Sequence, residues 1–102
     1  MELIIKKITL EKGKLVEVSK SPKIIVYFDG EKYFAFSGIC PHAKWPLEMG
    51  EVKEKTLTCA GHGWEFDITN GACTSNPGRD LIEYKIFEKD DELIISKKHS
   101  KI

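Results

Sequence analysis

Two short motifs, each with one cysteine and one histidine, restrict the fold of this 102-residue chain more than any other feature. The first is Cys40-Pro41-His42; the second, sixteen residues further on, is Cys59-Ala60-Gly61-His62. A thiolate and an imidazole within one tight turn can bind the same metal centre, and two such turns can close around it from opposite sides. The sequence therefore favours a fold that presents two opposed loops at one end.

The region around these motifs, residues 37–78, differs in composition from the rest of the chain. It holds six of the eight glycines, three of the four prolines, both tryptophans and all three cysteines. Gly61 and Gly63 flank His62, and glycines at such positions let backbone N–H groups approach a buried anion. We predict a loop-built subdomain over about 37–78, inserted into the β framework of a single domain, 1–102.

The remaining sequence has the pattern of an antiparallel β protein. No segment keeps apolar residues at a helical period over eleven or more positions, and glycine or proline interrupts the chain about every ten residues. The candidate strands, rich in β-branched and aromatic residues, are 2–9, 15–18, 23–28, 32–36, 55–58, 64–67, 81–87 and 93–96. Asp29-Gly30 predicts a tight primed turn between two of them, and residues 89–91 predict a second hairpin turn. The pattern indicates an all-β fold, a small antiparallel sandwich or partly open barrel.

Charge and hydropathy narrow the classes of partner. Sixteen basic and sixteen acidic side chains cancel, which argues against nucleic acid. The longest apolar run, residues 24–28, is far below the roughly 20 residues that span a bilayer, and no secretion signal is evident. We therefore expect a cytoplasmic protein without a membrane partner. The lack of glutamine, and lysine in place of arginine at all but one basic position, indicate a thermophilic source.

The paired motifs, continued by Gly63-Trp64-Glu65-Phe66-Asp67 and Asn70-Gly71, resemble those of Rieske-type 2Fe-2S ferredoxins. The likeness is greatest to the small soluble ferredoxins that serve bacterial ring-hydroxylating oxygenases, and it extends over residues 37–77. The resemblance implies one 2Fe-2S cluster per chain. By this likeness Cys40 and Cys59 would bind one iron, and His42 and His62 would bind the other.

Other residues of the region would surround this cluster. Asn76-Pro77-Gly78 is similar to the proline loop that covers the cluster in the family, which makes Pro77 a candidate contact. Trp45 and Trp64 each follow a candidate histidine closely and can shield a cluster from water. Gly61 and Gly63 allow the backbone to approach it. Cys73 is expected to be an inert buried thiol, because the two loops already supply complete pairs.

Two departures from the high-potential respiratory Rieske proteins are informative. Those proteins resemble this chain but carry one extra cysteine in each ligand loop, and the matching positions here are Trp45 and Gly61, which cannot form that disulfide. They also direct a serine and a tyrosine hydroxyl at sulfur, where this chain has Trp64 and Phe66. Fewer donors leave the reduced state less stabilised, so we predict a midpoint in the lower half of the Rieske window of about −150 to +300 mV.

The resemblance implies an electron-transfer protein, not an enzyme, that shuttles single electrons from a reductase to an oxygenase or another redox acceptor. Two alternatives remain open. The chain can be a permanently assembled small subunit of a reductase, or a structural zinc module with two cysteine and two histidine ligands. No motif encodes the identity of the donor or acceptor.

Overall fold

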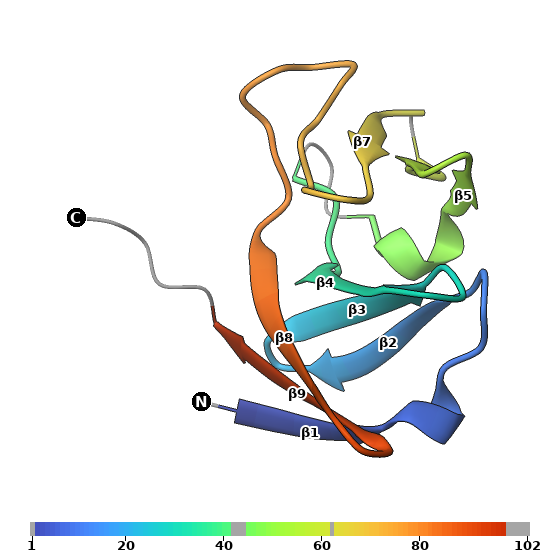
Figure 1. Ribbon diagram of the computed structural model, residues 1–102. Coiled ribbons are helices and arrows are strands. Elements are labelled where there is room, and N and C mark those ends of the chain that lie inside the picture. The colour runs from blue at the N-terminus through green and yellow to red at the C-terminus, as the bar shows by residue number, and fades with distance from the viewer. Residues whose placement is uncertain (1, 42–44, 62, 98–102) are drawn as a thin grey trace.

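The computed structural model describes residues 2–41, 45–61 and 63–97, which form two antiparallel sheets (Figure 1). The strands are β1 (Glu2–Lys6), β2 (Leu15–Lys20), β3 (Lys23–Phe28), β4 (Tyr33–Ser37), β5 (Glu51–Lys53), β6 (Thr56–Thr58), β7 (Glu65–Asp67), β8 (Glu83–Lys89) and β9 (Glu92–Lys97). There are also two short 3-10 turns. The first, η1 (Lys7–Thr9), follows β1, and the second, η2 (Leu47–Met49), precedes β5. The larger sheet has the order β1-β9-β8-β4-β3-β2 and forms a nearly closed barrel, whereas the smaller has the order β5-β6-β7. The predicted all-β, partly open barrel is confirmed.

Strands β3 and β4 separate two hydrophobic clusters. Successive side chains of a strand point to opposite faces, so Ile24 and Val26 join the cluster inside the barrel while Ile25 joins the cluster between the barrel and the small sheet. In β4, Ala35 and Phe36 divide in the same way. A strand covered on both faces reads as an unbroken apolar run, which explains the sequence of β3.

The hairpin between β3 and β4 forms as predicted, but its turn does not. Phe28 pairs with Tyr33, so the loop has four residues, and of its members only Gly30 has a positive φ, of 104°. The Asp29 carboxylate instead accepts hydrogen bonds from the backbone N–H groups of Glu31 and Lys32. The aspartate stabilises the loop through its side chain, without the left-handed conformation that a two-residue primed turn requires. The turn between β8 and β9 does have two residues, Asp90 and Asp91.

Several strand predictions differ from the structure. The first strand ends at Lys6, and the remainder of its predicted range, Lys7–Thr9, is a 3-10 turn. Strand β8 begins at Glu83 and not at 81. Strand β5, Glu51–Lys53, was not predicted. Its three residues hold one apolar side chain between two charged ones, a pattern too short to distinguish from a loop until β6 pairs with it.

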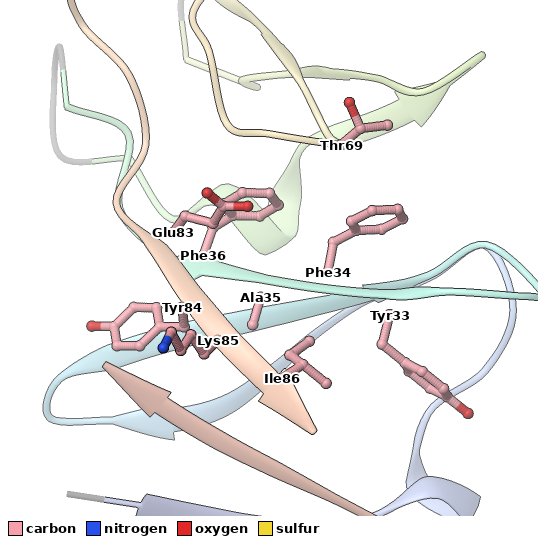
Figure 2. A pocket seen from close by; sticks show the side chains of 9 residues that line it. All are labelled: Tyr33, Phe34, Ala35, Phe36, Thr69, Glu83, Tyr84, Lys85 and Ile86. Carbon is pink, nitrogen blue, oxygen red and sulfur yellow. The ribbon is translucent and has the colours of Figure 1, made fainter. Parts of the chain in front are cut away.

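Strands β4 and β8 share the shortest pairing in the larger sheet. These strands pair only at Ala35 with Tyr84 and Phe36 with Glu83, which leaves a cleft of about 280 Å³ (Figure 2). Figure 2 shows Tyr33 and Phe34 leaving β4 on opposite sides of the ribbon at this cleft. Within the ranges that the structure covers, no helix is long and apolar enough to cross a membrane.

Candidate metal centre

The first cysteine lies in a loop between β4 and η2 that is closed by backbone hydrogen bonds. The Leu47 N–H donates to the Gly38 carbonyl at 2.8 Å, and the Cys40 N–H donates to the Trp45 carbonyl at 2.9 Å. These bonds bring the two ends of the loop together. Cys40 therefore lies where the ends of the first loop meet.

The second cysteine lies in a loop between β6 and β7 that closes in the same way. The Cys59 N–H donates to the Trp64 carbonyl at 2.8 Å, and the Gly63 N–H donates to the Cys59 carbonyl at 3.0 Å. Gly63 has a φ of +75°, a conformation that side chains disfavour, so glycine is required at this turn. In both loops a cysteine N–H thus bonds to a tryptophan carbonyl five positions later, a shared spacing that sequence reasoning did not use.

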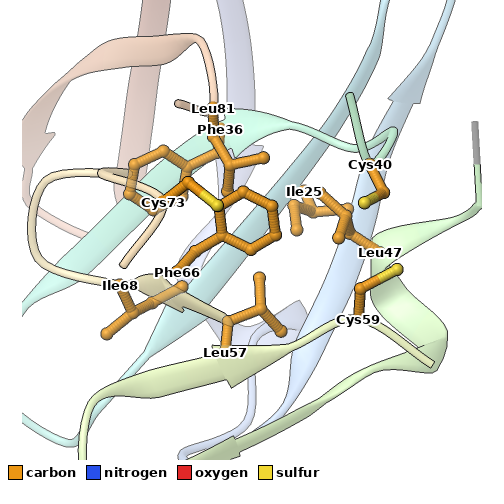
Figure 3. Close-up of a cluster of buried hydrophobic side chains, with 10 residues drawn as sticks. All are labelled: Ile25, Phe36, Cys40, Leu47, Leu57, Cys59, Phe66, Ile68, Cys73 and Leu81. Carbon is orange, nitrogen blue, oxygen red and sulfur yellow. The ribbon is translucent and has the colours of Figure 1, made fainter. Parts of the chain in front are cut away.

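Both cysteine side chains are buried and free of disulfides. Cys40 is 0% and Cys59 1% exposed, and both belong to the hydrophobic cluster between the barrel and the small sheet. In Figure 3 they lie on the Leu47 side of this cluster, whereas Cys73 lies on the side of Phe36. Leu47, fully buried, was not among the predicted site residues, although an apolar residue just after Pro46 was the available signal. The expectation that Cys73 is a buried thiol is confirmed.

The other half of the predicted ligand set, His42 and His62, lies outside the described residues. Among the residues that are described, no group of three or more histidine, cysteine or acidic side chains is placed to hold a metal ion. Two buried thiols without a disulfide, carried by two similarly closed loops, do fit the cysteine half of a 2Fe-2S site. The four-ligand assignment itself remains a prediction.

The predicted surrounding residues occupy different environments. Trp64 is half-buried and packs against the cluster that contains the cysteines. Trp45 is 40% exposed, and its ring lies against Gly61 in the other loop. Pro77 is exposed, in the long connection between β7 and β8 that Figure 1 shows at the top of the molecule. Whether these residues contact a cluster stays a prediction.

The connection that holds Pro77 is itself anchored near Cys73. The Cys73 N–H donates to the Asp80 carboxylate at 2.9 Å, and the Glu65 N–H donates to the Ser75 hydroxyl oxygen at 3.0 Å. Asp80 and Ser75 were not predicted to matter, because a short polar side chain in a loop rarely reveals its backbone partner from sequence alone. The Ser75 bond ties this connection to β7, and the Asp80 bond ties its later part back to Cys73.

An ion-pair group that sequence reasoning missed supports the first loop. The Lys23 ammonium contacts the carboxylates of Glu17 and Glu48, with an Nζ to Oε2 distance of 2.9 Å to Glu48 in η2. The Lys23 carbonyl accepts a hydrogen bond from the Gly38 N–H at 2.9 Å. The side-chain Cγ of Lys23 lies 2.8 Å from the position that a Cβ on Gly38 would occupy. Lys23 therefore touches the loop at its start, Gly38, and just beyond its end, Glu48.

Replacing Lys23 by methionine is expected to destabilise the protein by about 1–3 kcal/mol, because it keeps the contact with Gly38 but leaves the Glu48 carboxylate without its cation. Urea unfolding measures this difference. The matched control is Lys6→Met, whose partners Asp91 and Glu92 lie at the surface and whose loss should be within experimental error. Equal effects of the two substitutions would contradict the assigned role.

The difference between wild type and Lys23→Met should also depend on pH. The hydrogen bond from Lys23 lowers the pKa of Glu17 below its ordinary 4.5, so this stabilisation is present above pH 4.5 and is lost as the pH falls through the lowered pKa. Hydrogen bonds to Glu17 and Glu48 raise the pKa of Lys23 above 10.5, so at the alkaline end the stabilisation is lost only above that value. Unfolding at a series of pH values should show a constant difference between these limits.

This chain matches one protein-family model and several curated proteins. Residues 3–85 match the model of the Rieske [2Fe-2S] domain. Chlorophyllide a oxygenase of Arabidopsis thaliana is 32% identical over 71 residues, which are 70% of this chain and 13% of that protein. The methanesulfonate monooxygenase ferredoxin subunit of Methylosulfonomonas methylovora is 29% identical over 82 residues, 79% of this chain and 66% of that subunit. The chain spans only 8% to 13% of the first four curated relatives.

Solved structures with the same fold include small redox proteins. The ferredoxin of carbazole 1,9a-dioxygenase from Nocardioides aromaticivorans IC177 has a TM-score of 0.84 at 24% identity, over 93% of this chain and 95% of that one. A protein assigned as the small subunit of an NADPH nitrite reductase has a TM-score of 0.82 at 12% identity, over 93% and 97%. At such identities these likenesses establish the fold alone. The family match over residues 3–85 covers most of the sequence, and the chain therefore belongs to the Rieske [2Fe-2S] domain family.

Proposed function

We propose that this chain is a Rieske-type ferredoxin that carries one electron at a time from a reductase to an oxygenase component or another redox acceptor. The observation that carries the proposal is the pair of buried, disulfide-free cysteines on two loops of matching closure, within a domain of the Rieske family. In this assignment Cys40 and Cys59 hold one iron of the cluster, and His42 and His62 hold the other.

When bound, a cluster with this ligand set supplies reversible one-electron chemistry at a higher potential than four thiolates allow, because less negative charge accumulates on reduction. The chain's own residues provide the setting. Leu47 and Phe66 are fully buried in the same hydrophobic cluster as the two thiols, and this cluster excludes water from that side. The backbone bonds from Cys40 and Cys59 to the tryptophan carbonyls fix the backbone position of each cysteine.

The carrier role is favoured by the proteins that this chain matches along their full length. It covers 100% of the Sphingomonas yanoikuyae B1 ferredoxin and 97% of a matched chain in a complex of reduced oxygenase and oxidized ferredoxin in carbazole 1,9a-dioxygenase, with TM-scores of 0.83 and 0.86. We infer by analogy that the partner is an oxygenase component. Binding of the purified protein to a panel of oxygenase components, followed by reduction of the acceptor, tests this inference.

A second candidate, a small subunit fixed within a reductase, is favoured by the match to the nitrite reductase subunit. The two roles differ in how the protein occurs in a native extract. A carrier elutes at its own mass of about 11.6 kDa or as a small oligomer, whereas a fixed subunit co-elutes with a reductase. Size-exclusion chromatography with detection of this chain separates them.

The midpoint potential should lie in the lower half of the Rieske window, between about −150 and +75 mV. Phe66 is fully buried and has no hydroxyl to donate to sulfur, and Trp64 stands where the high-potential proteins have serine. Fewer hydrogen bonds to sulfur leave the reduced state less stabilised. Spectroelectrochemical titration of the anaerobically purified protein measures the value, and a midpoint near +300 mV would contradict the prediction.

Iron and acid-labile sulfide analysis of the same sample also excludes or establishes the zinc alternative. We further propose a cytoplasmic location, because the three buried cysteines form no disulfide, and a thermophilic source, because the chain lacks glutamine and uses lysine at all but one basic position. A holoprotein that unfolds within the usual mesophilic range of about 45–65 °C would overturn the second proposal.

A further inference from the structure

Among the described residues of the two cysteine-bearing loops, the indole of Trp45 lies against the backbone of Gly61. A Cβ built on Gly61 would lie 2.5 Å from Cδ1, 2.6 Å from Cγ and 2.6 Å from Nε1 of Trp45. Cβ atoms in proteins essentially never come this close to another heavy atom, and the obstacle is a rigid ring and not the end of a flexible chain. Glycine at position 61 is thus what lets the indole lie against the second loop.

The conformation of Gly61 does not explain the glycine by itself. The glycines of this structure with positive φ are at positions 13, 30, 63, 71 and 78, and Gly61 is not among them. Gly63, two residues later, shows the opposite case, with a φ of +75° and no atom within 4 Å of a built Cβ. Of the two glycines in this loop, one is required by backbone conformation and the other by the space that Trp45 occupies.

Burial does not explain the position of Trp45 either. Its side chain is 40% exposed, and it is not among the residues packed against either hydrophobic cluster. Its carbonyl accepts the Cys40 N–H at 2.9 Å, so its backbone is fixed to the first loop while its ring reaches the second. The Trp45 side chain therefore serves mainly as a contact between the two loops and not as part of a hydrophobic core.

We propose that Trp45 is a positioning residue that ties the two loops together through Gly61, and so slows the loss of the cluster that the loops enclose. This inference rests on the proposed function, because it assumes that the loops hold the cluster. Without the contact, the base of the first loop is still closed by its own hydrogen bonds, but its distance to the second loop is less restricted.

The test is a double-mutant cycle on the holoprotein, with Trp45→Ala, Gly61→Ala and the double variant. The readouts are the rate of iron release to an excess of a chelator, followed by the decay of visible absorbance, and the electron paramagnetic resonance spectrum of the reduced protein. Each single variant should release iron roughly tenfold faster than wild type and should show shifted or broadened signals, as expected for the loss of one packing contact. Gly61→Ala should add nothing in the Trp45→Ala background, where no ring opposes the new Cβ.

Two further variants keep the test decisive. Phe87→Ala removes another exposed aromatic side chain, in β8 and outside both cysteine-bearing loops, and should leave the release rate unchanged. Trp45→Phe retains a smaller ring and should fall between wild type and Trp45→Ala, which gives a readout even where the alanine variant folds poorly. Strictly additive effects in the double variant, or release rates equal to wild type in both single variants, would overturn the proposal. Absence of iron and sulfide from the wild type would overturn the proposed function instead.

Discussion

Replacing Cys40 by serine is expected to leave the protein with less than about a tenth of its 2Fe-2S cluster. Cys40 is fully buried, so its sulfur is shielded from ligands in solution. A serine hydroxyl is a much poorer ligand for iron in a cluster than a thiolate, because it stays protonated near neutral pH and is a harder donor. Iron and sulfide content per chain and the visible absorbance of the purified variant measure the loss.

Cys73 provides a matched control in the same hydrophobic cluster. It is a free cysteine with 3% exposure, and its sulfur lies 3.7 Å from the Ser75 hydroxyl oxygen. Cys73→Ser should keep the cluster at the wild-type level, because the new hydroxyl has a neighbour with which to hydrogen bond. A full cluster in Cys40→Ser, or its loss in Cys73→Ser alone, would show that the ligand assignment is wrong.

Sequence patterns predicted the β strands best where burial alone determines the order of apolar residues. The residues of β3 alternate between two cores, and an unbroken apolar run is what such a strand requires. Hairpins were found because turn residues mark them, although Asp29 closes its loop by accepting hydrogen bonds and not by the predicted conformation. Strand β5 was missed since three residues carry too little periodicity and depend on pairing with β6.

The candidate site was predictable to the level of residue type and spacing. Cysteine and histidine pairs can be read directly because metal binding needs those side chains, whereas the roles of Leu47 and Lys23 come from their neighbours in space. Trp45 and Gly61 were both singled out from the sequence, as the positions that match the paired cysteines of the high-potential proteins, but only the structure shows that the ring of one occupies the space left by the other. Such complementarity belongs to a pair of loops and is not encoded in either one.

Replacing His62 by cysteine is expected to lower the midpoint potential by some hundreds of millivolts in the molecules that retain a cluster. A third thiolate in place of a neutral imidazole adds one negative charge to the site, so adding an electron becomes less favourable. Plant-type clusters with four cysteines lie near −400 mV, against about −150 to +300 mV for Rieske centres, and the variant should fall between these classes.

His99→Cys, outside the region 37–78 that holds the ligand motifs, controls for adding a thiol elsewhere in the sequence and should leave the potential unchanged. Spectroelectrochemical titration of both variants, normalised to their iron content, separates a lowered potential from simple loss of cluster. An unchanged potential in His62→Cys at full cluster occupancy would mean that residue 62 is not bound to iron. Another neutral side chain would then have to be the fourth ligand, and the resemblance to the family would not say which one.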